Sequence, residues 1–186
     1  MLRVLREGAD LALLDDQVAC SVSDVILNKI TAAGYRISMK EDFVDDMHIL
    51  YVRVINPEVR NKYDRVVVTS TVMYRTDGKP VKRGNLPGVA FMDFFRTTDK
   101  NLRGGGLGRA VMCAVACMLK IAGQKSLELQ AVAIEDAKST ETQNEYRIRQ
   151  QRLIAYYQSF GFVYLPGENK FQIMVADIDD IVKTCA

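Results

Sequence analysis

The sequence predicts a mixed α/β fold with a central sheet, and three observations lead to it. Runs rich in β-branched and aromatic residues follow one another at residues 47–55, 65–74 and 89–98. A glycine cluster then opens an apolar helical segment that leads into a further strand. The length of 186 residues, with 48% hydrophobic and 26% charged residues, is ordinary for one soluble domain. We therefore expect one domain over residues 1–186.

The elements of the first half are a strand, a helix and a three-stranded meander. Residues 2–5 predict a short strand, and Ser21 or Ser23 is the expected N-cap of a helix that ends at Gly34. The three β-rich runs follow, separated by Asn-Pro, Asp-Gly and Pro-Gly turn signals. Neighbouring strands joined by short turns are expected to pair antiparallel.

The second half predicts a crossover and a closing hairpin. A helix runs from the glycine cluster to about Ala122, before a strand at residues 126–134. Strand, helix and strand in this order imply a parallel pair. A second helix is expected over residues 141–160, with Thr140 and Gln143 as a capping box. Residues 162–165 and 171–176 then predict the hairpin.

Composition excludes several classes of function. The formal net charge of +2 gives no field that would attract nucleic acid, and a nucleic-acid binder would rest on Lys79, Lys82 and Arg83 alone. That basic loop could also touch an acidic substrate, although a solvated hairpin is the simpler interpretation. The single histidine, His48, cannot build a histidine cluster, so no metal is expected. We interpret His48 as a structural or edge residue.

The cysteines and apolar runs predict a cytoplasmic protein that does not enter the membrane. No C-x-x-C pair occurs among the four cysteines, so we expect reduced thiols, and Cys113 and Cys117 are interpreted as small core residues. Residues 1–16 interleave charges and do not resemble a signal peptide. The longest apolar run, residues 110–119, is about half of the roughly 20 residues that a membrane span needs.

The glycine loop from Arg103 to Gly108 is the strongest functional signal. Glycines let phosphate oxygens approach backbone amides, and the helix that follows supplies unpaired N–H groups and a positive dipole end. A tight strand-to-helix turn is the alternative. Arg109 stands where a Walker A loop needs lysine and where a dinucleotide fingerprint needs its third glycine, so neither motif is present. The pattern predicts a pyrophosphate site.

The loop matches R-x-x-G-x-G in Arg103, Gly106 and Gly108, and a second motif, Y-x-x-x-G-F, begins at Tyr157. In these motifs the chain resembles the GNAT superfamily of acetyl-CoA-dependent N-acetyltransferases, over roughly residues 88–165. Gln150 and Leu153 depart from the family's usual Asn and Ala. The resemblance implies a mixed, mostly antiparallel sheet with a parallel pair at the coenzyme site, and acetyl-CoA as cosubstrate. The residues it implies for the coenzyme are Thr97, Thr98, Arg103, Gly104, Gly105, Gly106, Leu107, Gly108 and Arg109.

The same resemblance implies transfer of an acetyl group to a primary amine. Tyr157 is the expected general acid for the leaving thiolate, with a plain core tyrosine as the alternative. Asp93 is the expected base, in competition with Glu128, Glu135, a water chain, or a merely exposed carboxylate. The expected partner is an amine acceptor on a small molecule, peptide or protein, and a homodimer stays open. The alternative function is a catalytically inactive domain that senses CoA or binds a protein.

Overall fold

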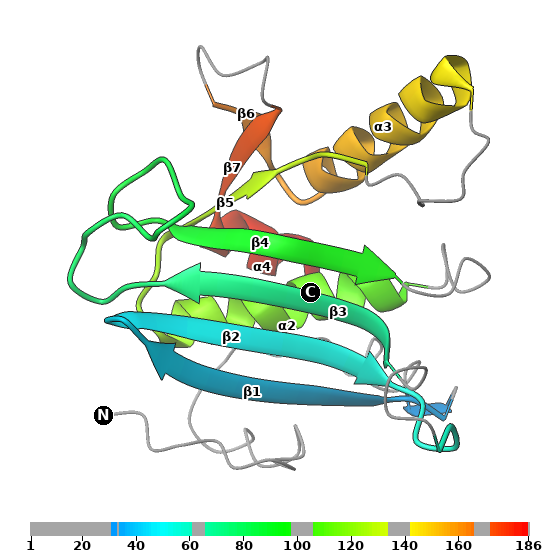
Figure 1. Cartoon of the computed structure of the whole chain (residues 1–186), viewed down its shortest axis with the longest axis horizontal. Coiled ribbons are helices and arrows are strands. Elements are labelled where there is room, and N and C mark those ends of the chain that lie inside the picture. Colours follow the sequence, from blue (N-terminus) through cyan, green and yellow to red (C-terminus); the bar gives the residue numbers. More distant parts are fainter. Residues whose placement is uncertain are drawn as a thin grey trace.

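The computed structural model describes residues 31–32, 34–60, 66–97, 106–133, 142–165 and 172–185. Seven strands form one sheet in the order β1-β2-β3-β4-β5-β7-β6 (Figure 1). The elements are β1 (Arg36–Val44), β2 (Met47–Ile55), β3 (Val66–Tyr74), β4 (Ala90–Thr97), α2 (Leu107–Ile121), β5 (Ser126–Gln130), α3 (Gln143–Gln158), β6 (Val163–Tyr164), β7 (Ile173–Asp177) and α4 (Ile178–Cys185). The expected mixed α/β class is confirmed.

The meander of β2, β3 and β4 is antiparallel and agrees with the expected strands to within one residue at each end. Strand β1 was not expected, and it adds an antiparallel edge to β2. The expected strand at residues 2–5 and all but the end of the first helix lie outside the described residues. Residues 31 and 32 are helical, and Gly34 follows with φ +77°, as expected for a helix end.

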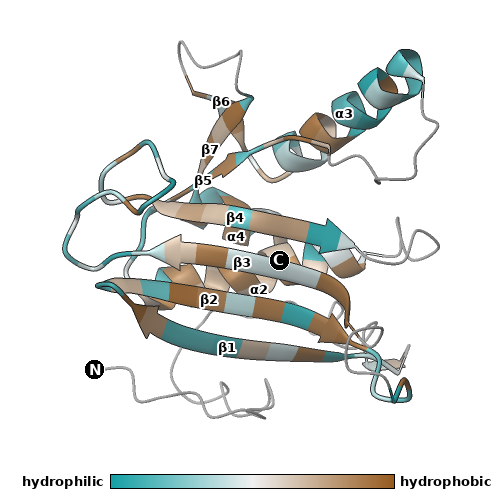
Figure 2. Ribbon diagram, in the orientation of Figure 1, coloured by the Kyte–Doolittle hydropathy of each residue, from teal (hydrophilic) through white to brown (hydrophobic). Residues whose placement is uncertain are grey.

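The crossover through α2 makes β4 and β5 parallel, as expected from strand, helix and strand. Helix α2 lies behind the sheet, and its buried residues run without a break from Ala110 to Leu119 (Figures 1 and 2). Strand β5 ends at Gln130, four residues earlier than expected. The chain turns there, because the amide of Val132 donates to the carbonyl of Gln130.

Helix α3 begins two residues later than expected. The capping box uses Thr142 and Glu145 in place of Thr140 and Gln143. The amide and hydroxyl of Thr142 both donate to the Glu145 carboxylate, at 2.8 Å and 2.7 Å. These charge-assisted bonds hold the pKa of Glu145 below its usual range. A carboxylate accepts both bonds more strongly than an amide oxygen, which explains the shift of the helix start.

Two apolar clusters hold the sheet. The larger one joins the back face of the sheet to α2, α4 and the last turn of α3. The smaller one lies on the other face, where Val81 from the loop between β3 and β4 packs on Met47, Met73 and Phe91. This 75–89 loop therefore covers one end of the front face (Figure 1).

Helix α4 was not expected. Its last residue, Cys185, shows that the prediction of reduced cysteines was wrong in part. Cys185 is bonded to Cys113 of α2, with 5.7 Å between the two Cα atoms, so the expectation of reduced thiols is wrong for this pair. The two residues are 72 positions apart, and no local spacing could reveal the pairing. Cys117 is a buried thiol in the core, as expected. Cys20 lies outside the described residues.

None of the helices in the described part of the chain is long and apolar enough to cross a membrane.

Candidate functional site

The sheet opens between its two parallel strands. Pairing between β4 and β5 covers only three residues of each strand and ends at Met92 and Leu129, although β4 continues to Thr97. Figure 1 shows β5 turning away from β4 beyond this point. A register shift against β3 leaves Asp93 as an extra residue at the same place. The second half of β4 thus presents backbone groups that β5 does not pair.

The N-terminus of α2 lies beyond the end of β4. Gly106 is the N-cap, with φ +84° and no side-chain cap, and the amide of Ala110 is bonded to its carbonyl at 3.0 Å. The amides of the first helical turn have no partner within the helix, so this end attracts an anion. Leu107 is buried and Gly108 half-buried. Thr98 and residues 103–105 of the expected coenzyme site lie outside the described residues.

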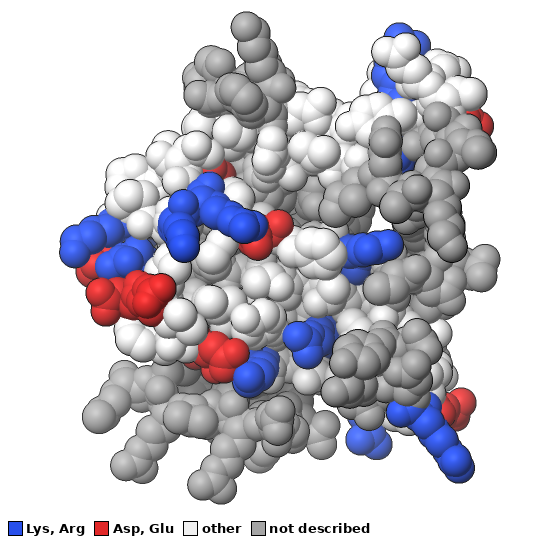
Figure 3. Space-filling model, in the orientation of Figure 1, with Lys and Arg blue, Asp and Glu red and all other residues white. Residues whose placement is uncertain are grey.

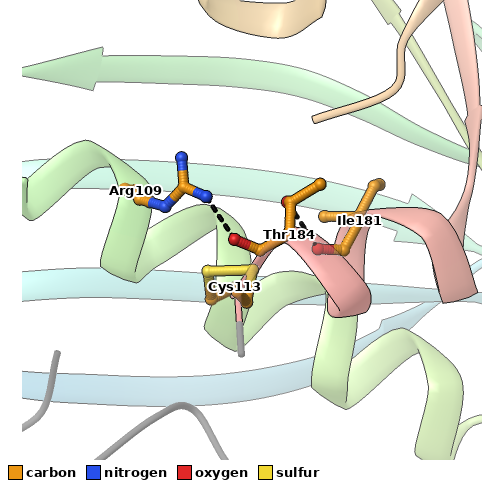
Figure 4. Close-up of a disulfide and its surroundings, with 5 residues drawn as sticks. Arg109, Cys113, Ile181 and Thr184 are labelled. Atoms are coloured by element: carbon orange, nitrogen blue, oxygen red, sulfur yellow. Dashed lines mark hydrogen bonds between the residues drawn. A yellow bond between two sulfur atoms is a disulfide. The ribbon is translucent and has the colours of Figure 1, made fainter. Parts of the chain in front are cut away.

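Arg109 has a structural partner. Its Nη2 donates to the backbone carbonyl of Thr184 in α4, and its guanidinium lies 5.1 Å from the ring centroid of Phe160 (Figure 4). Cys113, one turn further along α2, carries the disulfide to the same helix (Figure 4). In this arrangement the side chain fastens α4 to α2.

Tyr157 sits in the last turn of α3 with only 4% of its surface exposed. Its ring packs against Phe95 of β4, at 6.4 Å between centroids, and against Phe162, at 5.7 Å. Its hydroxyl makes no hydrogen bond to any residue that the structure describes. Burial raises the pKa of Tyr157 above its usual range, so the phenol is a proton donor at neutral pH. The phenol therefore keeps its proton, and the raised pKa makes it a weaker acid than an exposed tyrosine.

Tyr156, a residue that the sequence motifs do not single out, lies beside it. The two rings pack edge to face, with 5.4 Å between centroids. The Tyr156 hydroxyl is buried and has no hydrogen-bond partner among the described residues. A Cβ atom built on Gly108 would lie 3.1 Å from this oxygen. The hydroxyl therefore reaches the first turn of α2.

Asp93 is engaged in an ion pair. Arg83 of the 75–89 loop donates to its Oδ1 at 2.6 Å, and 66% of the arginine side chain and 29% of the aspartate side chain are exposed. Figure 3 shows basic and acidic side chains interleaved over this loop. Asp77 likewise pairs with Arg75 at 2.7 Å and with Lys79 at 3.3 Å. The basic loop is thus largely neutralised by carboxylates, as a solvated hairpin would be.

Glu128 of β5 holds the 75–89 loop through hydrogen bonds. It is fully buried, and its carboxylate accepts from the amide of Asn85 at 3.0 Å and from the amide of Leu86 at 3.2 Å. The side-chain amide of Asn85 donates to it as well. A buried carboxylate satisfied by three donors is a structural tether. Glu135, the other competing base, lies outside the described residues.

Gln150, one of the departures from the family pattern, is buried between α3 and the chain after β5. Its Oε1 accepts from the amide of Ala133 at 2.7 Å, and its Nε2 donates to the carbonyl of Ala131 and to Gln172. The longer amide side chain thereby satisfies backbone groups that left the sheet at Gln130. Sequence reasoning marked the departure without finding this role.

His48 lies on β2, and Thr97 lies at the end of β4. His48 Nδ1 lies 3.0 Å from the Glu41 carboxylate, and its ring stacks on Tyr74 at 4.7 Å between centroids. Burial, followed by Glu41, raises the pKa of Tyr74 above its usual range. Thr97 is the last residue of β4 and faces Val68 of β3. Within the described part of the chain, no three histidine, cysteine or acidic residues gather in a way that could hold a metal ion.

Comparison with known proteins gives the fold. No family model and no curated protein matches the chain. It is similar to Elp3 from Methanocaldococcus infernus, with 11% identity and TM-score 0.50, over 78% of this chain and 30% of that one. It is also similar to a GNAT-family acetyltransferase from Staphylococcus aureus, with 11% identity and TM-score 0.42, over 70% and 68% of the two chains. The GNAT family N-acetyltransferase YhbS from Escherichia coli, in complex with CoA, has 16% identity and TM-score 0.41, over 98% and 86%.

At these identities the similarity is one of fold. The solved structures that resemble this chain include GNAT-family acetyltransferases. The sheet has the architecture expected from the sequence, because all of its strand pairs are antiparallel except β4 and β5.

Proposed function

We propose that the protein is an acetyl-CoA-dependent N-acetyltransferase that transfers an acetyl group from the thioester to a primary amine. The observation that carries the proposal is that three features meet at Phe95, which lies in the unpaired half of β4. The ring of Tyr157 packs on Phe95 at 6.4 Å between centroids, and a Cβ built on Gly108 of the first turn of α2 would lie 3.5 Å from the same ring. A thioester with a pyrophosphate at its other end needs these groups together.

The N-terminus of α2 is the proposed holder of the coenzyme's pyrophosphate. Gly106 and Gly108 present no side chain there, so phosphate oxygens can approach the amides of the first turn. The buried Tyr156 hydroxyl has no hydrogen-bond partner among the described residues, and this supports the fit, since buried polar groups normally have one. The backbone of β4 beyond Met92 is left to bind the thioester arm and the carbonyl oxygen.

Tyr157 is the proposed general acid. When the amine nitrogen bonds to the acetyl carbon, the bond from carbon to sulfur breaks, and the phenol gives its proton to the leaving sulfur. Asp93 is the proposed base for the amine, and its ion pair with Arg83 must open before the carboxylate can accept that proton. A proton taken by Asp93 and one given by Tyr157 balance the transfer.

The direct test is consumption of acetyl-CoA against a panel of small amines, peptide N-termini and protein lysines. Release of free CoA thiol with at least one class of amine supports the enzyme. Binding of CoA without turnover against every class would favour the alternative, a domain that senses CoA or binds a protein. Absence of CoA binding would contradict both.

A further inference from the structure

The packing of the protein does not explain why residue 156 is a tyrosine with a hydroxyl group. The ring fills space between Phe95, at 6.0 Å between centroids, and Phe160, at 5.2 Å. A phenylalanine would make the same ring contacts. The oxygen is buried without a hydrogen-bond partner among the described residues, and such a group destabilises the folded state. A ligand that supplies the missing partner would explain the tyrosine.

The hydroxyl lies where an anion would be held. Gly108 is the second residue of α2. A Cβ atom built on it would lie 3.1 Å from the Tyr156 oxygen and 3.5 Å from the Phe95 ring. The amides of this first turn have no partner within the helix. A phosphate oxygen above the turn could accept from these amides and from the phenol together.

Arg109, the basic residue in the first turn of α2, is already engaged. Arg109 donates to Thr184 and lies over Phe160, so its guanidinium serves the contact between α2 and α4. Burial, followed by the neighbouring Tyr157, raises the pKa of Tyr156 above its usual range, so the phenol keeps its proton. At the described part of the site, a neutral donor stands where the sequence led us to expect a charged one.

We propose that Tyr156 is a coenzyme-binding residue whose hydroxyl donates a hydrogen bond to a phosphate oxygen bound at the first turn of α2. The inference rests on the proposed function and deepens it, because it divides the two adjacent tyrosines. Tyr156 binds the phosphate end of the coenzyme, and Tyr157 gives its proton to the sulfur.

The test is Tyr156→Phe in the full chain, measured by urea unfolding and by titration calorimetry with CoA and with ADP. Without ligand, the variant should be as stable as the wild type or more stable, because it loses a buried oxygen without a partner. Its affinity for CoA should fall about tenfold or more, the usual loss for a hydrogen bond to a charged group. ADP carries pyrophosphate without the thiol arm, so its affinity should fall by the same factor.

Tyr146→Phe is the matched control on the same helix. That ring lies under the guanidinium of Arg149 at 5.5 Å, in the opposite half of α3, and its loss should leave both affinities unchanged. A second variant, Gly108→Ala, brings a Cβ to 3.1 Å from the Tyr156 oxygen and should also weaken CoA binding. The effect should shrink in the Tyr156→Phe background, because the crowded atom is gone.

Equal CoA affinity for Tyr156→Phe and the wild type would overturn the inference and leave the proposed function standing. Loss of CoA affinity with unchanged ADP affinity, or an ADP that does not compete with CoA on the wild type, would overturn the phosphate contact. Absence of CoA binding by the wild type itself would overturn the proposed function together with this inference.

Discussion

Arg109 donates a hydrogen bond to the backbone carbonyl of Thr184 and so ties the first turn of α2 to the last turn of α4. One turn along α2, Cys113 makes the covalent link to Cys185 (Figure 4). The helix that presents its N-terminus to the proposed coenzyme site is thus fixed from behind at two successive turns. An anion site gains from a fixed helix, because amides already in place need no reordering when the ligand binds.

Replacement of Arg109 by methionine separates the two roles open to this residue. We expect Arg109→Met to lower the free energy of unfolding by about 2 kcal/mol, since a hydrogen bond from a charged group and the contact with Phe160 are lost. The dissociation constant for CoA should change less than about threefold, which corresponds to about 0.7 kcal/mol. Urea unfolding and calorimetry give both values. A tenfold loss of CoA affinity with an unchanged free energy of unfolding would indicate instead that Arg109 binds a phosphate of the coenzyme.

Removal of the disulfide should destabilise the protein without removing its site. Cross-linking residues 72 positions apart restricts the unfolded chain, and Cys185→Ala should lower the free energy of unfolding by about 4 kcal/mol. Wild type that has been unfolded and refolded with dithiothreitol should lose the same amount. Cys117→Ala is the control, because this buried thiol forms no cross-link and should respond to the reductant as the wild type does. Identical urea midpoints with and without reductant would contradict the role of the bond.

The sequence predicted the fold correctly for those elements whose local residue pattern also determines how they pack. β2, β3 and β4 carry β-branched and aromatic residues because α2 covers one face of the inner sheet and Val81 of the 75–89 loop covers one end of the other face. β1 was not predicted, because this edge strand carries four charged residues and Met39 is its one buried residue. Helix α4 escaped because eight residues are too few for a clear period.

The site was readable only in part. The glycine loop and Tyr157 belong to motifs, so the sequence could point to them. Tyr156 belongs to no motif. Its proposed role depends on Gly108 of another helix, which only the fold brings near it. The role of Arg109 depends in the same way on Thr184, a residue 75 positions away. Contacts between distant residues are set by packing and not by local spacing.

Gly106 tests the coenzyme site directly. Its φ of +84° lies in the region that favours glycine, so Gly106→Val should cost about 1–2 kcal/mol of stability and obstruct the approach to the amides. CoA binding by calorimetry should be lost while far-ultraviolet circular dichroism still shows a folded chain. Gly123→Val is a matched control at the other end of α2, with φ +75° and equally open surroundings. It should cost similar stability and leave CoA affinity unchanged; equal affinity in both variants would sink the assignment.

Asp93 and Arg83 form a pair whose members should behave differently. Asp93→Asn should lower kcat by about a hundredfold or more if the carboxylate takes the amine proton. Arg83→Gln frees the carboxylate from its 2.6 Å contact and should leave kcat within about threefold, the scale of a surface ion pair. Both are measured with the best amine from the panel. Unchanged kcat in Asp93→Asn would remove this residue from the reaction and leave the proton to water.

Tyr157→Phe is the sharpest test of the chemistry, because it removes one oxygen and keeps the ring contacts with Phe95 and Phe162. We expect kcat to fall by about 10²–10⁴ with little change in KM or in CoA affinity. A plain core tyrosine would give normal kcat instead, and stability would change little, since its hydroxyl has no protein partner among the described residues to lose.

The pH profile of the wild type gives the same test from the other side. Burial raises the pKa of Tyr157 above its usual value near 10, so the acid form persists below that pH. The rate should rise as the amine loses its proton and should show no falling limb below about pH 10. A falling limb near pH 8 that disappears in Tyr157→Phe would mean that the phenol titrates early in the complex. The same limb persisting in the variant would assign the proton donor to another group.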